Sequence, residues 1–426
     1  MHPITRLRRT VRVSTLGARL WLHYKLPEYW GKLLGRPEPS KAHKARQHEI
    51  AGQWILDCAL SMRGVMIKMC QGVATRADTF PPEFVEKLKQ CHDAVPPKPF
   101  AVVRAAVERE LGKPLGALFA EFSETPIASA SLAQVHAARL LSGEEVAVKV
   151  QYPDIDDIVQ TDLRNMERAC RVYERFDPQP LELLPLLKEL TTHTRMELDM
   201  RREADSCDRV RALFADDPRV WIPRIHRELS TGRVLVMERV HGMKITDKPT
   251  LEAAGLDPAD VVQDLMRVYV RMILAAGFFQ ADPHPGNLMV TRDGRLIVLD
   301  FGLSKELPEG YGLGLFELMF SMMTMNESAM IRAFKELGFE TKTGDTNTFL
   351  LIARRMLTRS KSGAFEGEFT EEMTDELFEA IREDPVVRVP SDFVLVGRVF
   401  SFLSGIAHTL GSRANVLSAM GAGPPS

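Results

Sequence analysis

The segment from residue 280 to residue 302 reads Q-A-D-P-H-P-G-N-L-M-V-T-R-D-G-R-L-I-V-L-D-F-G, and the rest of the chain is best understood from it. Two short apolar runs, Leu288 to Val290 and Leu296 to Leu299, flank an Asp-Gly pair, which is a strong signal for a β-hairpin. Pairing the two strands would bring Asn287 and Asp300 to the same end of the hairpin. The sequence therefore predicts that two oxygen-bearing side chains, thirteen residues apart, lie close together.

These side chains suit nucleotide chemistry. In protein kinases a catalytic aspartate lies five residues before an asparagine, and a later D-F-G aspartate joins that asparagine in holding magnesium on ATP. Asp282 and Asn287 have this spacing, and a D-F-G begins at Asp300. Magnesium prefers oxygen ligands, and Asp282 would orient or deprotonate a nucleophile. The alternative is a turn rich in Asp, Pro, Gly and Asn, followed by an ordinary strand end.

A second segment, E-E-V-A-V-K-V-Q at residues 144–151, predicts a strand. Its three valines would face one side, and Ala147 and Lys149 the other. V-A-V-K matches the kinase strand whose lysine reaches the ATP phosphates, although a lone lysine on a strand is usually an ordinary edge residue. A kinase would carry a glycine-rich loop just upstream. Here residues 126–132, P-I-A-S-A-S-L, contain no glycine.

Composition indicates a globular protein of two or three structural units, with 426 residues, 45% hydrophobic and 26% charged. The longest apolar run, Phe393 to Gly411, is interrupted by Arg398 and His408, so we expect a packed helix and no integral membrane segment. Five cysteines without C-x-x-C spacing disfavour a disulfide framework and a zinc site, and favour a reducing compartment.

Positive charge is concentrated at the N-terminus. Residues 1–46 hold eleven lysines and arginines against two glutamates, a net charge of about +9, together with Trp21, Tyr24, Tyr29 and Trp30. Basic residues with interfacial aromatics predict contact with an anionic membrane surface. A solvated disordered arm and an acid-poor transit peptide remain alternatives. We expect no nucleic acid partner, because no nucleic-acid motif accompanies the charge.

Helical patterns follow this basic segment. Residues 47–72 predict one amphipathic helix ending in I-K-M-C-Q-G, with Lys68 and Gln71 one turn apart, and two further helices are expected at residues 83–92 and 100–111. On their own, Lys68 and Gln71 would be ordinary solvated helix residues.

The segment after D-F-G is short. Residues 304–310 lead directly into an apolar helical pattern that starts at Leu313, and no A-P-E follows. Without room for a long activation loop, an ordinary protein kinase with a peptide substrate is disfavoured.

Taken in order, these motifs give the chain a specific resemblance. It resembles the UbiB/AarF family of atypical kinases, which includes bacterial UbiB and the mitochondrial coenzyme Q kinase-like proteins, over about residues 47–410. The resemblance rests on eight motifs: I-K-M-C-Q, T-R-A-D-T-F-P-P-E-F, P-I-A-S-A-S-L-A-Q-V-H, V-A-V-K-V-Q-Y-P, E-L-D-M-R-R-E-A, R-V-L-V-M-E, Q-A-D-P-H-P-G-N and L-D-F-G.

The resemblance implies roles for further residues. It implies two regulatory motifs, K-x-G-Q at Lys68 and Gln71 and E-x-D at Glu197 and Asp199. It implies an alanine-rich phosphate loop formed by Ala128, Ser129, Ala130 and Ser131. It also implies that Glu203 pairs with Lys149, and that Met237, Glu238 and Val240 form an adenine-binding hinge. Without the resemblance, Glu203 is not distinguishable from Glu167 or Glu174. At two positions the chain departs from the family pattern: Cys70 stands where the family has glycine, and Ser129 where it has alanine.

We therefore expect an α+β, two-lobed, atypical protein-kinase-like fold with an N-terminal helical extension. The expected divisions are a basic arm (1–46), the extension (47–111), a small lobe with a helical insertion (112–240), a helical large lobe (241–420) and a tail (421–426). Catalysis would use Asp282, Lys149 and Glu203, with ATP and Mg²⁺ as cofactors.

The expected reaction is ATP hydrolysis or phosphorylation of a small or lipid-like acceptor in ubiquinone or other isoprenoid-lipid metabolism. The alternative is a catalytically silent ATP-binding scaffold. Expected partners are anionic membrane lipids, isoprenoid or quinone-like lipids and a quinone-biosynthesis complex. The expected location is the inner face of a bacterial membrane or, alternatively, the mitochondrial matrix side.

Overall fold

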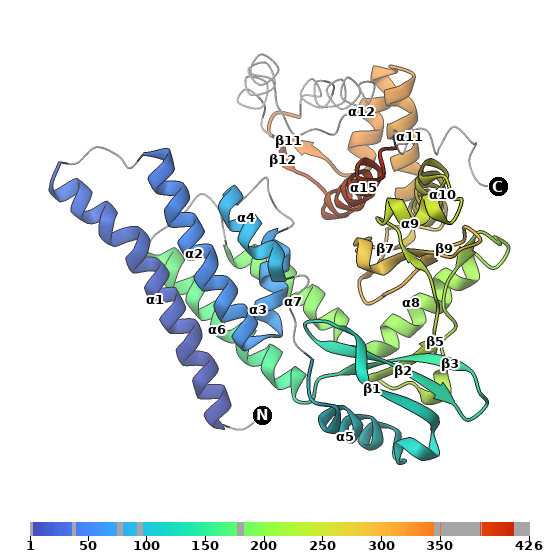
Figure 1. The fold of residues 1–426 in the computed structure, drawn as a ribbon. Helices are drawn as coiled ribbons and strands as arrows, with labels where there is room; N and C mark the ends of the chain where they lie inside the picture. Colours follow the sequence, from blue (N-terminus) through green and yellow to red (C-terminus); the bar gives the residue numbers. More distant parts are fainter. Residues whose placement is uncertain are drawn as a thin grey trace. The chain divides into compact units, whose positions relative to one another are not determined.

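The computed structural model describes residues 3–35, 40–74, 80–91, 97–176, 183–344, 350, 384 and 386–412 (Figure 1). The chain forms two compact units, each described by itself below. Unit 1 comprises Met1–Arg202 and Ile225–Arg239, and unit 2 comprises Glu203–Arg224 and Val240–Ser426. The predicted tail at 421–426 lies outside the described residues.

Unit 1 combines a helical layer with a four-stranded antiparallel sheet of order β1-β2-β3-β5. Its helices are α1 (Pro3–Leu33), α2 (Lys41–Met62), α3 (Val65–Ala74), α4 (Pro82–Leu88), the 3₁₀ turn η1 (Lys89–Cys91), α5 (Phe100–Leu111), α6 (Ile155–Phe176) and α7 (Leu183–Glu197). Its strands are β1 (Phe119–Ser129), β2 (Ala133–Leu140), β3 (Glu145–Gln151) and β5 (Val234–Glu238).

The N-terminal segment differs from two expectations. The basic arm is a long helix, α1, that packs on α2 and α6, so the disordered-arm alternative is wrong for the described residues 3–35. The predicted boundary at residue 46 falls inside α2. The single helix expected over 47–72 is two helices. Arg63 and Gly64 both have positive φ, of 58° and 61°, which ends α2 and lets the chain turn into α3. Periodicity alone does not reveal this break, because both helices continue the apolar pattern.

A buried ion pair fastens α1 to the other helices. The Arg9 guanidinium donates from Nε to Oδ1 of Asp162 on α6 at 2.7 Å, and its Nη2 contacts the second oxygen of the same carboxylate. Its third nitrogen donates to the carbonyl of Met62 at 2.8 Å, which satisfies an acceptor at the C-terminal end of α2. One side chain thus joins three helices. Removing one partner of such a buried pair costs about 3–5 kcal/mol.

The sheet of unit 1 is covered on one face by α5. The helix starts after Pro99 and ends at Gly112, whose φ of 69° gives a left-handed C-cap. Its Val103 and Val107 pack against the valines of β3 and β5 in a single apolar cluster. The predicted helix at 100–111 is confirmed.

Unit 2 contains helices and three small sheets. Its helices are α8 (Met200–Leu213, which begins just before the boundary), α9 (Lys248–Ala253), α10 (Pro258–Val270), the π-helical turn η4 (Arg271–Ala275), the 3₁₀ turn η5 (Pro285–Asn287), α11 (Tyr311–Met323), α12 (Glu327–Glu336) and α15 (Ser391–Leu410). Its strands form the orders β4-β9-β8-β6, β10-β7 and β11-β12. They are β4 (Val220–Trp221), β6 (Met243–Lys244), β7 (Phe278–Gln280), β8 (Leu288–Val290), β9 (Leu296–Val298), β10 (Ser304–Glu306), β11 (Glu340–Thr341) and β12 (Val386–Arg388).

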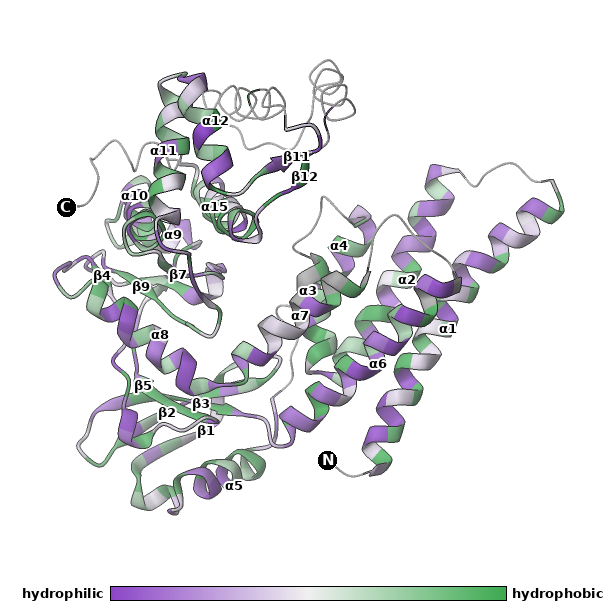
Figure 2. Cartoon of the chain, turned by 180° about the vertical axis from the view of Figure 1, so that it is seen from behind, coloured by the Kyte–Doolittle hydropathy of each residue, from purple (hydrophilic) through white to green (hydrophobic). Residues whose placement is uncertain are grey.

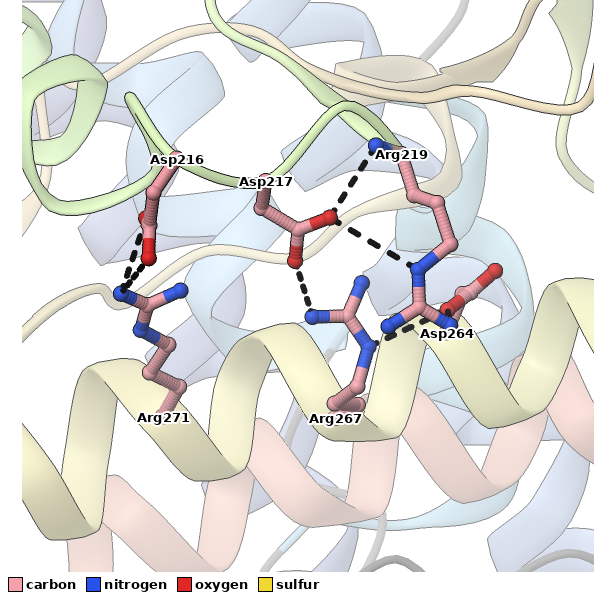
Figure 3. A network of polar contacts seen from close by, with 6 residues as sticks. All are labelled: Asp216, Asp217, Arg219, Asp264, Arg267 and Arg271. Carbon is pink, nitrogen blue, oxygen red and sulfur yellow. Dashed lines mark hydrogen bonds and ion pairs between the residues drawn. The ribbon is translucent and has the colours of Figure 1, made fainter. Parts of the chain in front are cut away.

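A polar network joins the segment after α8 to α10 (Figure 3). Its members are Asp216, Asp217, Arg219, Asp264, Arg267 and Arg271. Asp217 accepts from the Arg219 backbone N–H at 3.0 Å and from the Arg267 guanidinium. Burial alone would raise the pKa of Asp217, but these two hydrogen bonds and the nearby positive charges hold it below its usual range. The network fixes the segment after α8 on α10, and within the described residues the buried Nη2 of Arg267 has no hydrogen-bond partner.

The start of α11 packs closely on the π-helical turn. A side chain at Gly312 would place its Cβ 2.5 Å from the Leu274 carbonyl oxygen and 2.9 Å from that of Ile273. Backbone atoms cannot move aside as a flexible side chain can, so this position requires glycine. The short connection expected after D-F-G is present, with only β10 and a turn between it and α11.

One helix of the described residues, α15, is long and apolar enough to cross a membrane by length and composition alone. Its Val399, Leu403, Ile406 and Leu410 are at most 2% exposed within unit 2, and α15 contacts α10. One face of α15 therefore packs within unit 2, and 33% of its apolar window is buried.

We predict that Gly312→Ala lowers the stability of the protein by about 1–3 kcal/mol, because overpacking against two carbonyl oxygens outweighs the gain in helix propensity. Gly397→Ala in α15, where the added Cβ would meet nothing within 4 Å, is the matched control and should raise stability by about 0.5–1 kcal/mol. Thermal denaturation followed by circular dichroism measures both. Equal effects at the two positions would contradict the close packing.

Candidate functional site

The predicted hairpin is present in unit 2. Strands β8 and β9 pair antiparallel with Leu288 opposite Val298, and the turn between them places Gly294 at a φ of 86°. The pairing extends one step further, because the Leu299 N–H donates to the Asn287 carbonyl at 2.8 Å. Asn287 and Asp300 therefore lie at the same end of the hairpin, as the sequence predicts.

A buried glutamine organises this end of the hairpin. The Gln280 side chain is fully buried, and its amide nitrogen donates to the backbone carbonyls of Asp282 at 2.6 Å and Asp300 at 3.2 Å. Its amide oxygen accepts from the hydroxyl of Tyr269 on α10 at 2.7 Å. The side chain thus connects both acidic segments to α10, and its contact with Tyr269 is buried.

The loop between Asp282 and the hairpin is held by its own hydrogen bonds. The Asn287 side-chain amide donates to the Asp282 carbonyl at 3.1 Å, and the His284 N–H donates to the same carbonyl at 2.7 Å. Burial raises the pKa of Tyr269 well above its usual value, and the negative charge of Asp282 adds to this effect. The Asp282 carboxylate therefore lies near enough to Tyr269 for its charge to be felt.

The donor set fits a magnesium ion bound together with phosphate. Because the Asn287 amide nitrogen is engaged, its amide oxygen is the atom that can face a cation, and Asp300 supplies a carboxylate, one oxygen of which accepts from the Gly302 N–H at 3.1 Å. Asp300 has a φ of 54°, an unusual conformation for a residue other than glycine. Among the described residues no group of three or more His, Cys, Asp or Glu could hold a metal alone. A two-ligand site completed by phosphate oxygens and water is the arrangement these residues allow.

In unit 1, β3 presents Lys149 as predicted. Val146, Val148 and Val150 are at most 2% exposed in the core under α5, whereas Lys149 is half-buried on the opposite face, paired in register with Val135 and Leu235. The alternation expected from the sequence is confirmed, and it directs the lysine away from the apolar core.

The alanine-rich segment is a tight strand connection. Strand β1 continues through Ala128 to Ser129, so the connection is shorter than the expected loop, and the Ala130 N–H donates to the Ala133 carbonyl at 2.8 Å. Tyr152, just after β3, donates its hydroxyl hydrogen to the Ala130 carbonyl at 3.1 Å and so accepts from Ser129 at 2.9 Å.

This connection is therefore fastened by side-chain hydrogen bonds. Ser131 is also buried. Ser129, which departs from the family alanine, adds a hydrogen bond to a half-exposed turn.

Glu203 and the expected adenine-binding hinge lie near the points where the chain passes from one unit to the other. Glu203 is in the first turn of α8 and is 3% exposed. The expected hinge begins in β5, where Met237 bridges to Ile225, and the unit boundary falls between Arg239 and Val240. The expected hinge thus coincides with a crossing of the chain from one unit to the other.

The expected regulatory residues form one close contact. Lys68 Nζ on α3 lies 2.5 Å from Glu197 Oε2 at the end of α7, and both side chains are about four-fifths buried. Asp199 instead accepts from the Arg201 N–H at the start of α8, and Gln71 donates to the Cys91 carbonyl at 3.3 Å. In the described part of the chain, the contact between the two motifs is the one between Lys68 and Glu197.

Three residues of these sites were not singled out from the sequence. Gln280 and Tyr269 organise the acidic loop, and Tyr152 fastens the alanine-rich connection. The available signal for Gln280 is a polar residue that ends an otherwise apolar strand, F-F-Q. Nothing in the sequence identifies its tyrosine partner, because that pairing depends on how α10 packs.

Comparisons with known proteins identify the family of this chain. A family model described as an ABC1 atypical kinase-like domain matches residues 90–334. The chain is 33% identical over 368 residues to "Protein ACTIVITY OF BC1 COMPLEX KINASE 7, chloroplastic" from Arabidopsis thaliana, covering 86% of this chain and 53% of that protein. It is 36% identical over 314 residues to "Probable protein kinase UbiB" from Marinobacter nauticus, covering 70% of this chain and 56% of that protein.

The fold is also similar to a solved structure. The complex of Rv3197 with erythromycin from Mycobacterium tuberculosis has a TM-score of 0.61 and 24% sequence identity, and the similarity covers 88% of this chain and 96% of that chain. At this identity the likeness concerns the fold alone. Among curated relatives, the chain spans about half to two thirds of their length.

We predict that Tyr269→Phe lowers stability by about 1–3 kcal/mol, because it removes the hydroxyl that donates to the buried Gln280 amide oxygen. Tyr29→Phe, at a position where the side chain is largely exposed, is the control and should have no measurable effect. Urea denaturation of the full chain measures the difference. A midpoint for Tyr269→Phe that matches wild type would show that the hydroxyl does not support the loop.

Proposed function

Because this chain belongs to the ABC1 atypical kinase-like family, we propose that it binds MgATP and hydrolyses it or transfers its terminal phosphoryl group to a small or lipid-like acceptor. The observation that carries the proposal is the end of the β8–β9 hairpin. There Asn287 and Asp300 are brought together, and the preceding loop with Asp282 is fastened to the same place by Gln280.

Each of these residues would have a distinct role in binding or catalysis. Asn287 and Asp300 would hold magnesium, which neutralises charge on the phosphates when bound. Asp282 would orient the attacking oxygen and accept its proton on a carboxylate oxygen. Lys149 would contribute a positive charge to the phosphates, with Glu203 as its positioning partner.

The remaining expected nucleotide contacts have more limited roles. The connection Ala128 to Ser131 would approach the phosphates through backbone N–H groups, and Met237, Glu238 and Val240 would bind adenine. These assignments follow the family motifs, and the contacts seen within each unit are compatible with them.

We further propose that the activity supports ubiquinone or other isoprenoid-lipid metabolism. One relative carries the name "Probable protein kinase UbiB", and the short connection after D-F-G leaves little room for a peptide-binding segment. Isoprenoid or quinone-like lipids, or a quinone-biosynthesis complex, would then be the partners. A protein that binds MgATP without turnover would instead be a scaffold for such a complex.

Helix α1 supports a location at a membrane surface. Its apolar residues occupy two opposite sides. Val13 and Leu16 pack into unit 1, while a second series remains about half exposed or more. This exposed stripe recurs at helical spacing and comprises Ile4, Leu7, Val11, Leu22, Leu26, Tyr29 and Leu33. Figure 2 shows hydrophobic residues along the length of α1.

Basic residues border the exposed stripe. Arg8, Arg12 and Arg19 are exposed along the helix, and among the side chains of α1 only Glu28 is acidic. An apolar stripe with a basic border fits the interface of a bilayer that contains anionic lipids. We propose that α1 lies on such a surface, at the inner face of a bacterial membrane or on the mitochondrial matrix side.

We predict that Asp300→Asn weakens MgATP binding by at least about tenfold, because one of two protein ligands to magnesium loses its charge. Asparagine also tolerates the left-handed backbone that Asp300 adopts, so the fold should be preserved. Thermal shift with ATP, with and without magnesium, measures the effect. Undiminished metal-dependent stabilisation of the variant would overturn the magnesium assignment.

The companion variant Asp282→Asn separates binding from turnover. It should retain MgATP-dependent stabilisation and lose turnover by about 100-fold or more, since its carboxylate acts on the nucleophile. Turnover equal to wild type would show that Asp282 has no catalytic role. A wild-type protein that binds MgATP but shows no turnover with quinone-like phenols and liposomes would indicate the scaffold.

We predict that the double variant Leu22→Glu and Leu26→Glu weakens sedimentation with anionic liposomes at least about tenfold, because two leucines leave the interface and two negative charges enter it. Val172→Glu, an exposed apolar position on α6, is the control and should sediment like wild type. Higher salt should weaken binding of the wild-type protein. Equal sedimentation of the α1 variant and the control would exclude the exposed stripe of α1 as the membrane contact.

A further inference from the structure

Two buried cysteines meet beside the Lys68 helix. Cys70 is on α3 and Cys91 ends η1, and both side chains are fully buried in one apolar cluster. The thiol of each cysteine lies close enough to the other to shift its pKa. The neighbouring Gln71 donates its side-chain amide to the Cys91 carbonyl at 3.3 Å, which holds η1 against α3. Both cysteines are free thiols in this structure.

The contact satisfies the first requirement of a disulfide. Two cysteines can be joined only when their side chains approach each other across a short distance. Cys70 and Cys91 share one buried apolar cluster, and the elements that carry them, α3 and η1, pack directly on each other. A third cysteine, Cys58 on α2, lies in the same cluster but hydrogen-bonds to the sulfur of Met62.

The proximity of the two thiols makes them unequal. The interaction with Cys70 lowers the pKa of Cys91, against the opposing effect of burial. The interaction with Cys91 and burial together raise the pKa of Cys70. Cys91 is therefore the sulfur that ionises first, and the thiolate is the reactive form.

We propose that Cys70 and Cys91 form an oxidation site for hydroperoxides, at which a reversible disulfide fastens α3 to η1. The Cys91 thiolate attacks one oxygen of hydrogen peroxide, the O–O bond breaks, and hydroxide leaves and is protonated to water. The sulfur of Cys70 then attacks the resulting sulfenic acid of Cys91. The S–O bond breaks, the hydroxyl leaves with the Cys70 proton as a second water, and two thiols have been oxidised by one peroxide.

This site explains what the cysteine in the K-x-C-Q sequence does. The disulfide would close a loop of about twenty residues and hold α3 at the turn that carries Lys68, whose partner is Glu197. Because both sulfurs are buried, peroxide reaches them only when α3 and η1 open locally. The rate of this local opening therefore limits the rate of oxidation. The proposal depends only on contacts within unit 1 and is independent of the proposed nucleotide chemistry.

Peptide mapping of the full-length protein tests the linkage. After treatment with hydrogen peroxide and alkylation of the remaining thiols, non-reducing tryptic digestion should yield peptide 69–76 joined to peptide 90–104. A reductant should reverse the linkage. Cys70→Ala and Cys91→Ala should each abolish the linked peptide, whereas Cys58→Ala, with its cysteine in peptide 47–63, should retain it. Circular dichroism establishes that each variant is folded.

The outcomes are distinct. Linkage of either peptide to 47–63, or alkylation of both Cys70 and Cys91 in peroxide-treated wild type, would overturn the proposal. Hydrogen–deuterium exchange tests the constraint on the same samples. Amides of residues 65–74 should exchange at least severalfold more slowly in the oxidised protein than in the reduced protein, with no such change in Cys70→Ala. Equal exchange in the two forms would show that the disulfide does not fasten α3.

Discussion

The side-chain amide of Gln280 is completely buried, so its nitrogen and oxygen both require hydrogen-bond partners within the protein. An unpaired buried amide is costly, and here its nitrogen is satisfied by two backbone carbonyls and its oxygen by a tyrosine hydroxyl. The two carbonyls belong to Asp282 and Asp300. The positions of the acidic residues are therefore set by main-chain contacts. A buried network of polar groups is rigid only when each group has its hydrogen-bond partners. The Gln280 amide meets this condition at both its nitrogen and its oxygen.

Unit 1 follows the same principle with charges. Arg9 joins α1 to α6 through a carboxylate and to α2 through a carbonyl at the helix end, so one buried guanidinium positions the N-terminal helix. Because that side of α1 is occupied inside the unit, the apolar residues on the opposite side are the ones that remain exposed.

Local chemistry predicted much of this structure. The hairpin, the outward-facing Lys149, α5 and the buried C-terminal helix follow from alternation, turn residues and helical spacing. The break at Arg63 and Gly64 does not, because the apolar pattern continues across it. Nor do Tyr269, Asp162 and Tyr152, whose partners are distant in sequence and are chosen by packing. The Lys68–Glu197 contact was implied by family resemblance, and the residues alone did not identify it.

The division of the chain has a consequence for its synthesis. Neither unit is continuous: the chain leaves unit 1 after Arg202, returns at Ile225 and leaves again after Arg239. During translation the sheet of unit 1 therefore cannot be completed until β5 has been synthesised. Until residues 234–238 emerge from the ribosome, β3 has an unpaired edge. By then the first helix of unit 2 has also been made. No single cut in the chain releases either unit intact, so truncated fragments ending between Arg202 and Arg239 would expose an edge strand and be prone to aggregate.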